Sequence, residues 1–173
     1  MFRLIKKTQA YFCVKRSNDL DKQICAIYDA IKGRLAYPGR WPKDLAAFLY
    51  PMWIVNEVEN GGPLQLLANP SGQHLQQMQD ALEQVDSKKG LAFMDAVATA
   101  FQPYAEEAIQ AVAAKPDEHP FISFLDYFEA RGIDVDDIFG EAETIFFDQG
   151  GKEEMLSRAV RYVKQHPTLL FRV

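Results

Sequence analysis

The chain has 173 residues, of which 48% are hydrophobic, and this composition excludes an intrinsically disordered protein and suffices for one folded domain. It contains no long uninterrupted apolar run, and Lys6 and Lys7 break the N-terminal segment, so we expect a cytoplasmic protein without a membrane span or secretion signal. The net charge of −5 conceals an acidic middle, because residues 46–154 hold five Lys or Arg and twenty Asp or Glu, while both flanking segments are basic.

Helical periodicity begins near residue 17. Residues 17–35 predict an amphipathic helix, with Ser17 or Asn18 as its N-cap. Its apolar face consists of residues three or four positions apart: Leu20, Ile24, Ile27 and Ile31. This spacing is typical of a helix that packs one side on a core.

The next helical pattern is the most apolar of the sequence. Residues 43–60 are apolar on nearly all sides as far as Val55, which predicts a buried central helix. We expect a kink or restart at Pro51 and a helix end at Gly61 and Gly62.

Six further helical patterns follow, separated by short stretches with Gly, Pro or Asp. They cover residues 73–86, 91–101, 103–114, 121–131, 135–147 and 152–165. Neither an alternating strand pattern nor an internal repeat is visible. The sequence therefore predicts an all-α fold over residues 1–173, a single compact multi-helix domain with a buried central helix, in which residues 1–40 form a basic helical part.

Residues suited to catalysis or metal binding are scattered. His74, His119 and His166 fall on separate predicted elements, and Cys13 and Cys25 lie twelve residues apart without a nearby histidine. No hydrolase, phosphate-loop or dinucleotide-binding motif is present. We therefore predict no enzymatic activity, no cofactor and no metal, with a hydrolase of converging carboxylates as the alternative that metal detection would test.

Residues 133–151 carry six carboxylates and no Lys or Arg. On a helical wheel the apolar residues gather within an arc of about 120°: Val135, Ile138, Phe139, Ala142, Ile145 and Phe146. The acidic residues form two stripes beside this arc, with Asp134, Asp137, Glu141 and Asp148 on one flank and Asp136 and Glu143 on the other. In the preceding helical pattern, Asp126 and Glu129 also lie outside the apolar face.

Rows of carboxylates on a helix can imitate the phosphates of DNA. Residues three or four apart rise by about 4.5–6 Å, a repeat comparable with the phosphate spacing along a DNA strand. The same negative charge argues against direct binding of nucleic acid. A solvated acidic face that only promotes solubility is the other reading of this pattern.

Residues 56–73, NEVENGGPLQLLANPSGQ, contain a compact motif of Glu, Gly, Gln and Asn. Its positions are Glu57 or Glu59, Asn60, Gly61, Gly62, Gln65, Asn69, Ser71 and Gly72. We interpret it as structural, with the glycines reversing the chain while Asn60, Gln65 and Asn69 satisfy exposed backbone groups. The motif resembles the signature of a bacterial DNA-mimic protein family, small acidic all-helical proteins once known only as a domain of unknown function, and the similarity covers residues 41–170.

The resemblance implies a homodimer that displays DNA-like negative charge and occupies the DNA-binding surface of a transcription regulator of the helix-turn-helix type. Such a complex would keep a repressor from its operator and derepress its targets. The wheel and the charge distribution, and not the family motif, select the phosphate-mimicking residues: Asp126, Glu129, Asp134, Asp136, Asp137, Glu141, Glu143 and Asp148. The alternative is a generic acidic interaction module that does not compete with DNA.

Overall fold

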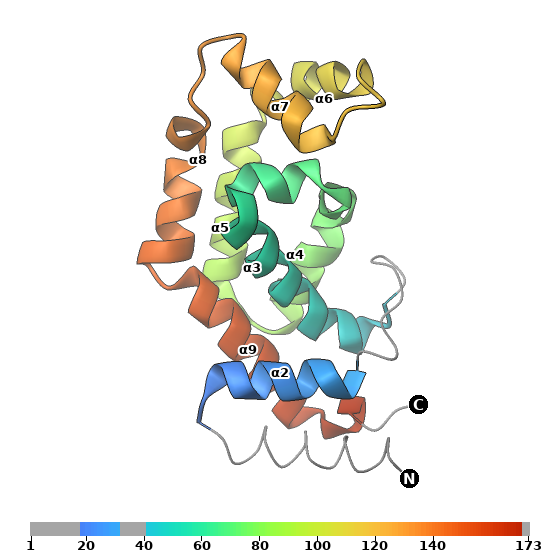
Figure 1. The fold of residues 1–173 in the computed structure, drawn as a ribbon. Helices are drawn as coiled ribbons and strands as arrows, with labels where there is room; N and C mark the ends of the chain where they lie inside the picture. The colour runs from blue at the N-terminus through green and yellow to red at the C-terminus, as the bar shows by residue number, and fades with distance from the viewer. Residues whose placement is uncertain (1–17, 32–40, 171–173) are drawn as a thin grey trace.

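The computed structural model describes residues 18–31 and 41–170, which fold into packed helices (Figure 1). Within these two ranges the chain contains no strand, and the predicted all-α class is confirmed. The elements in chain order are α2 (Leu20–Ile31), α3 (Lys43–Ala68), η2 (Pro70–His74), α4 (Leu75–Gln84), α5 (Lys88–Phe101), α6 (Ala105–Ala113), α7 (Pro120–Glu129), α8 (Val135–Glu143), η3 (Thr144–Asp148), α9 (Gly151–Gln165) and η4 (Pro167–Leu170). Among the described helices, none has the length and apolar character needed to cross a membrane.

Helix α2 begins at Leu20, one residue after the start that an N-cap at Asn18 would give. The carboxylate of Asp19 accepts a hydrogen bond from the backbone N–H of Lys22 at 3.1 Å, so Asp19 caps the helix in place of Asn18. Asp19 takes this role because it directly precedes Leu20, the first helical residue. Ser17, the other expected cap, lies outside the described residues. The expected apolar face is buried or half-buried: Leu20, Ile24, Ile27 and Ile31.

Helix α3 is the spine of the fold and packs against α4, α7, α8 and α9. Its non-helical backbone angles fall at Gly61 (φ −169°, ψ 28°) and Gly62 (φ 71°, ψ −173°), and not at Pro51. The helix then resumes at Pro63 and continues to Ala68, because proline is well tolerated in a first helical turn. The expected helix end at Gly61 and Gly62 is therefore confirmed, because two helical segments of α3 meet at this bend. The expected restart at Pro51 does not occur, because the backbone stays helical there.

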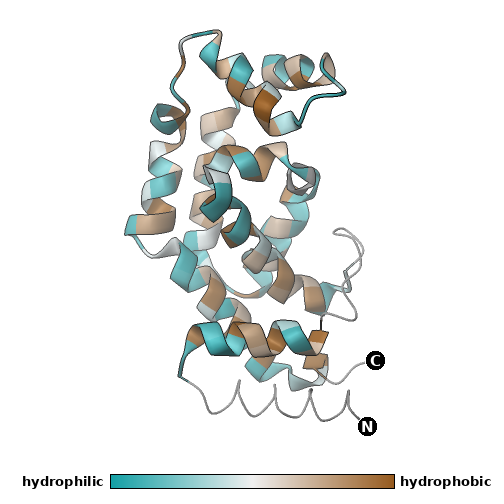
Figure 2. Ribbon diagram, in the orientation of Figure 1, coloured by the Kyte–Doolittle hydropathy of each residue, from teal (hydrophilic) through white to brown (hydrophobic). Residues whose placement is uncertain are grey.

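The core between α3, α5, α7, α8 and α9 is rich in aromatic residues. Phe93 of α5 contacts Phe146, with ring centroids 5.2 Å apart, and Phe101 contacts Phe124 at 5.6 Å in an edge-to-face arrangement. Such pairs stabilise a core beyond the area that they bury. Hydrophilic and hydrophobic residues alternate along the ribbons of α8 and α9, as expected for helices with one buried side (Figure 2).

Candidate protein-binding surface

Helix α8 lies along one edge of the molecule (Figure 1) and packs on α5 and α3. Asp134 is its N-cap, and the carboxylate accepts a hydrogen bond from the backbone N–H of Asp136 at 3.0 Å. Phe139 and Ala142 are each 1% exposed, which fixes the rotation of the helix about its axis. The buried side predicted by the wheel is thus the buried side of the structure, and the acidic residues are left at the surface.

The predicted phosphate-mimicking residues lie mostly in solvent. Seven of them are exposed and Glu143 is half-buried; the exposed ones are Asp126, Glu129, Asp134, Asp136, Asp137, Glu141 and Asp148. We use the name α8 acidic surface for the six that belong to α8 and its two ends: Asp134, Asp136, Asp137, Glu141, Glu143 and Asp148. Within the described chain, no Lys, Arg or His forms an ion pair with any of these six carboxylates.

Two cations of α9 form ion pairs with carboxylates that lie outside the α8 acidic surface. Lys152 pairs with Glu59, and Arg158 pairs with Asp86 at 2.9 Å. These pairs reduce the negative field on the α9 side of the molecule, whereas no ion pair among the described residues reduces the charge of the α8 acidic surface.

One stripe of this surface reaches the bend of α3. Partial burial raises the pKa of the Glu143 carboxyl, and the nearby charge of Asp136 raises that pKa further. A Cβ atom added to Gly62 would lie 3.3 Å from Oε1 of Glu143. Asp136 and Glu143 are thus close enough in the folded chain for their charges to interact, and the absence of a side chain at Gly62 leaves room for the Glu143 carboxylate.

Helix α7 contributes less charge than its sequence indicates. Asp126 forms an ion pair with Lys115 at 2.6 Å, while Glu129 is exposed and has no ion pair with the described residues. Hydrogen bonds to Asp126 and to Glu118 raise the pKa of the Lys115 ammonium group. The sequence had not indicated this compensation, because Lys115 lies before α7 and meets Asp126 only in the folded chain.

The Glu, Gln and Asn residues of the 56–73 motif meet in space. Glu57 is 7% exposed and accepts hydrogen bonds from Nε1 of Trp53 at 2.7 Å, Nε2 of Gln65 at 3.2 Å and Nδ2 of Asn69 at 2.5 Å. We call these four residues the Glu57 clasp. It joins the two halves of α3 across the glycine bend, so Glu57, Gln65 and Asn69 of the motif make structural contacts.

The hydrogen-bond partners expected for Gln65 and Asn69, exposed backbone groups, were wrong, however. The side-chain amides of Gln65 and Asn69 donate to a buried carboxylate and not to backbone carbonyls, because a charged acceptor in the core must be matched by donors. Asn60 is exposed. Gly72 is required for a different reason, since a Cβ atom at this position would lie 2.1 Å from the backbone oxygen of Leu67.

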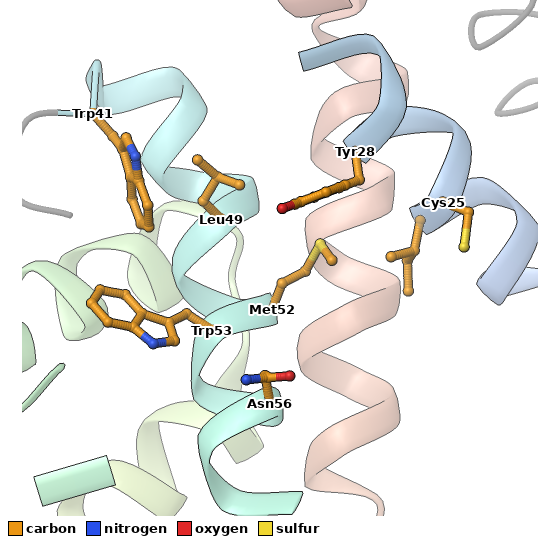
Figure 3. A pocket seen from close by; sticks show the side chains of 8 residues that line it. Cys25, Tyr28, Trp41, Leu49, Met52, Trp53 and Asn56 are labelled. Carbon is orange, nitrogen blue, oxygen red and sulfur yellow. The ribbon is translucent and has the colours of Figure 1, made fainter. Parts of the chain in front are cut away.

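An apolar cavity of about 530 Å³ lies between α2 and α3 (Figure 3). The described residues of its lining contain two indole rings, a phenol and a thioether but no carboxylate, imidazole, ammonium or guanidinium group: Ile24, Cys25, Tyr28, Trp41, Leu49, Met52, Trp53 and Asn56. Asn56 supplies the one amide of this described lining, and an amide without a charged neighbour makes a weak site for a hard metal ion. Across the described residues, no group of His, Cys, Asp or Glu could hold a metal ion.

Comparison with known proteins identifies the family of this chain. Residues 39–166 match the sequence model of the DMP19-like proteins. The matched part contains the Glu57 clasp and the whole α8 acidic surface, while α2 lies outside it. No curated protein and no solved structure matches the chain. Because the match spans well over half of the sequence, this chain belongs to the DMP19-like protein family.

Proposed function

We propose that this protein is a DNA mimic. Its α8 acidic surface occupies the DNA-binding surface of a transcription regulator of the helix-turn-helix type, prevents that regulator from holding its operator and so derepresses the target genes. The protein works as a homodimer, without catalysis or a cofactor, and does not bind nucleic acid itself. The observation that carries the proposal is a set of six surface carboxylates without an ion pair among the described residues.

The arrangement of these charges lowers the stability of α8 itself. Asp137 and Glu141 are like charges four residues apart, a spacing that costs a few tenths of a kcal/mol in a helix. Gly140 within the same helix costs roughly 1 kcal/mol relative to alanine. Packing of the buried apolar side compensates for both costs, so α8 stays helical in spite of these residues and not because of them. This pattern supports a role for the carboxylates outside the fold.

A DNA-binding protein presents cationic side chains at the spacing of phosphates. Carboxylates three, four and seven residues apart along α8 offer negative charges at intervals of about 4.5 to 10.5 Å along one edge. Association would be steered by opposite fields and would weaken as salt screens them. A generic acidic interaction module shares this salt dependence but leaves the DNA-binding surface of its partner free.

Charge reversal with a matched control tests the proposal. Asp137→Lys with Glu141→Lys raises the net charge by four on α8, and Asp80→Lys with Glu83→Lys does the same on α4, which Figure 1 places on the other side of α3 from α8. All four residues are exposed, so both variants should keep the far-UV circular dichroism of helices. Each protein is immobilised, exposed to lysate of the source cells, and its bound proteins are identified.

The proposal predicts that the wild type and the α4 variant recover a helix-turn-helix regulator and that the α8 variant does not. Recovery of the same regulator by the α8 variant, with unchanged affinity, would remove Asp137 and Glu141 from the site. Equal loss in both variants would show that total charge matters and the position of the charge does not.

A further inference from the structure

One large exposed apolar side chain directly precedes Asp148 of the α8 acidic surface. Phe147 is 51% exposed, although its neighbour Phe146 is fully buried. Both belong to η3, a π-helical turn in which the backbone N–H of Gln149 donates to the carbonyl of Thr144 at 3.0 Å. A π turn inserts a residue into a helix and is frequent at functional sites.

The ring of Phe147 is held in place. Its centroid lies 4.8 Å from that of Phe146, and the two rings meet edge to face at 81°. Because Phe146 is itself buried against Phe93, the Phe147 ring contacts the core on one side while half of it is exposed to solvent. An aromatic side chain held in this way loses little conformational freedom when a partner covers it.

Carboxylates lie on both sides of this residue in the sequence. Glu143, at the C-terminal end of α8, precedes Phe147 by four residues, and Asp148 follows it directly. Asp136 acts on Glu143 through its charge and extends the same stripe. The partner of this surface must therefore present cations around an apolar recess, a chemistry that a simple polycation lacks.

DNA offers that same combination to a protein. Phosphates surround base edges, and proteins that read the major groove make apolar contacts with the methyl group of thymine. Resting on the DNA-mimic function above, we propose that Phe147 takes the place of a base edge and enters the apolar part of the regulator's DNA-reading surface. The ring then anchors the complex, while the carboxylates on either side of it take the place of phosphates.

Substitution of the ring separates this role from that of the charges. The probe is the regulator recovered with the wild type, and its affinity is measured over a series of salt concentrations. Phe147→Ala should weaken binding about tenfold, as for a buried aromatic anchor, without changing the slope of log affinity against log salt. Phe147→Leu should retain most of the affinity. Ile109→Ala, an equally exposed apolar position on α6 at 56%, is the matched control and should bind as the wild type does.

A second measurement does not depend on the stability of the alanine variant. Replacing Phe147 with the photocrosslinking analogue benzoylphenylalanine should give an adduct to a peptide of the regulator's DNA-binding domain. Equal affinity of Phe147→Ala and the wild type, an equal loss in Ile109→Ala, or binding without an adduct at position 147 would each overturn the anchor role. If the wild type recovers no DNA-binding protein, the proposed function itself fails, and the anchor role fails with it.

Discussion

Replacing Glu57 with leucine removes the acceptor that three side chains share. In the folded protein Trp53, Gln65 and Asn69 all donate to this carboxylate, which is 7% exposed. The variant leaves these donors facing a methyl group at the place where the two halves of α3 meet. We therefore expect a large loss of stability from one substitution that removes no carboxylate of the α8 acidic surface.

The size of this loss follows from opposing contributions. Hydrogen bonds to a charged group contribute about 1.5–3 kcal/mol each to net stability. The donors of Trp53, Gln65 and Asn69 are half-buried, so water recovers part of that contribution, and the buried leucine adds about 1.5–3 kcal/mol. A net loss of about 2–4 kcal/mol remains, which for a chain of this length lowers the midpoint of thermal unfolding by about 6–12 °C.

The assay is thermal unfolding followed by circular dichroism, with Glu83→Leu as the control. Glu83 lies exposed on α4, so its variant should stay within about 0.5 kcal/mol of the wild type. Glu57→Gln should lie between the two, because the amides of Gln65 and Asn69 can turn their oxygens inward whereas the indole of Trp53 can only donate. An unfolding midpoint of Glu57→Leu equal to that of Glu83→Leu would refute the clasp as a source of stability.

Three further outcomes test other contacts. Gly62→Ala places a side chain at φ 71° and should destabilise the protein by about 1–2 kcal/mol in urea unfolding; an unchanged midpoint would contradict the role of the bend. Burial raises the pKa of Glu143 above its ordinary 4.5, so the folded state loses stability as pH rises above about 4.5 and the carboxyl ionises. The free energy of unfolding of Glu143→Gln should therefore exceed that of the wild type by a fraction of a kcal/mol at neutral pH and equal it below about pH 4. A pH-independent difference would contradict this sign. Lys115→Gln frees the charge of Asp126 and should strengthen binding of the regulator at low salt; unchanged affinity would place α7 outside the interface.

Helix α8 shows what local sequence determines. Its buried side at Phe139 and Ala142 follows from residue type and from the period of the helix, so the wheel predicted it without knowledge of the fold. The cap at Asp134 was not among the predictions, although aspartate is a favoured residue at that position. The exposure of its carboxylates then followed from the same rotation. For this reason the sequence could predict the acidic surface and the all-α class together.

Contacts between residues far apart in the sequence could not be predicted from helical periodicity. Glu57 meets Asn69 only because Gly61 and Gly62 bend α3, and twelve residues along a straight helix would have kept the two apart. The sequence motif left Glu57 and Glu59 as equal candidates, and folding buries Glu57 while Glu59 stays exposed and pairs with Lys152.

Two features of the site were missed for a similar reason. The wheel assumed a regular helix through residue 147, whereas the chain forms a π turn there and leaves Phe147 half in solvent. The pairing of Asp126 with Lys115 depends on how the segment between α6 and α7 folds back. The spacing of residues within one helix carries no information about either feature.

The most direct test of the proposed function is a competition between this protein and duplex operator DNA for the purified regulator. Fluorescence anisotropy of labelled operator bound to the regulator is followed while the protein is added at moderate salt. The account predicts that the DNA is released completely, that excess operator reverses the release, and that Asp137→Lys with Glu141→Lys abolishes it. A complex that holds the operator and this protein at the same time would contradict DNA mimicry and leave the α8 acidic surface as an ordinary interaction surface.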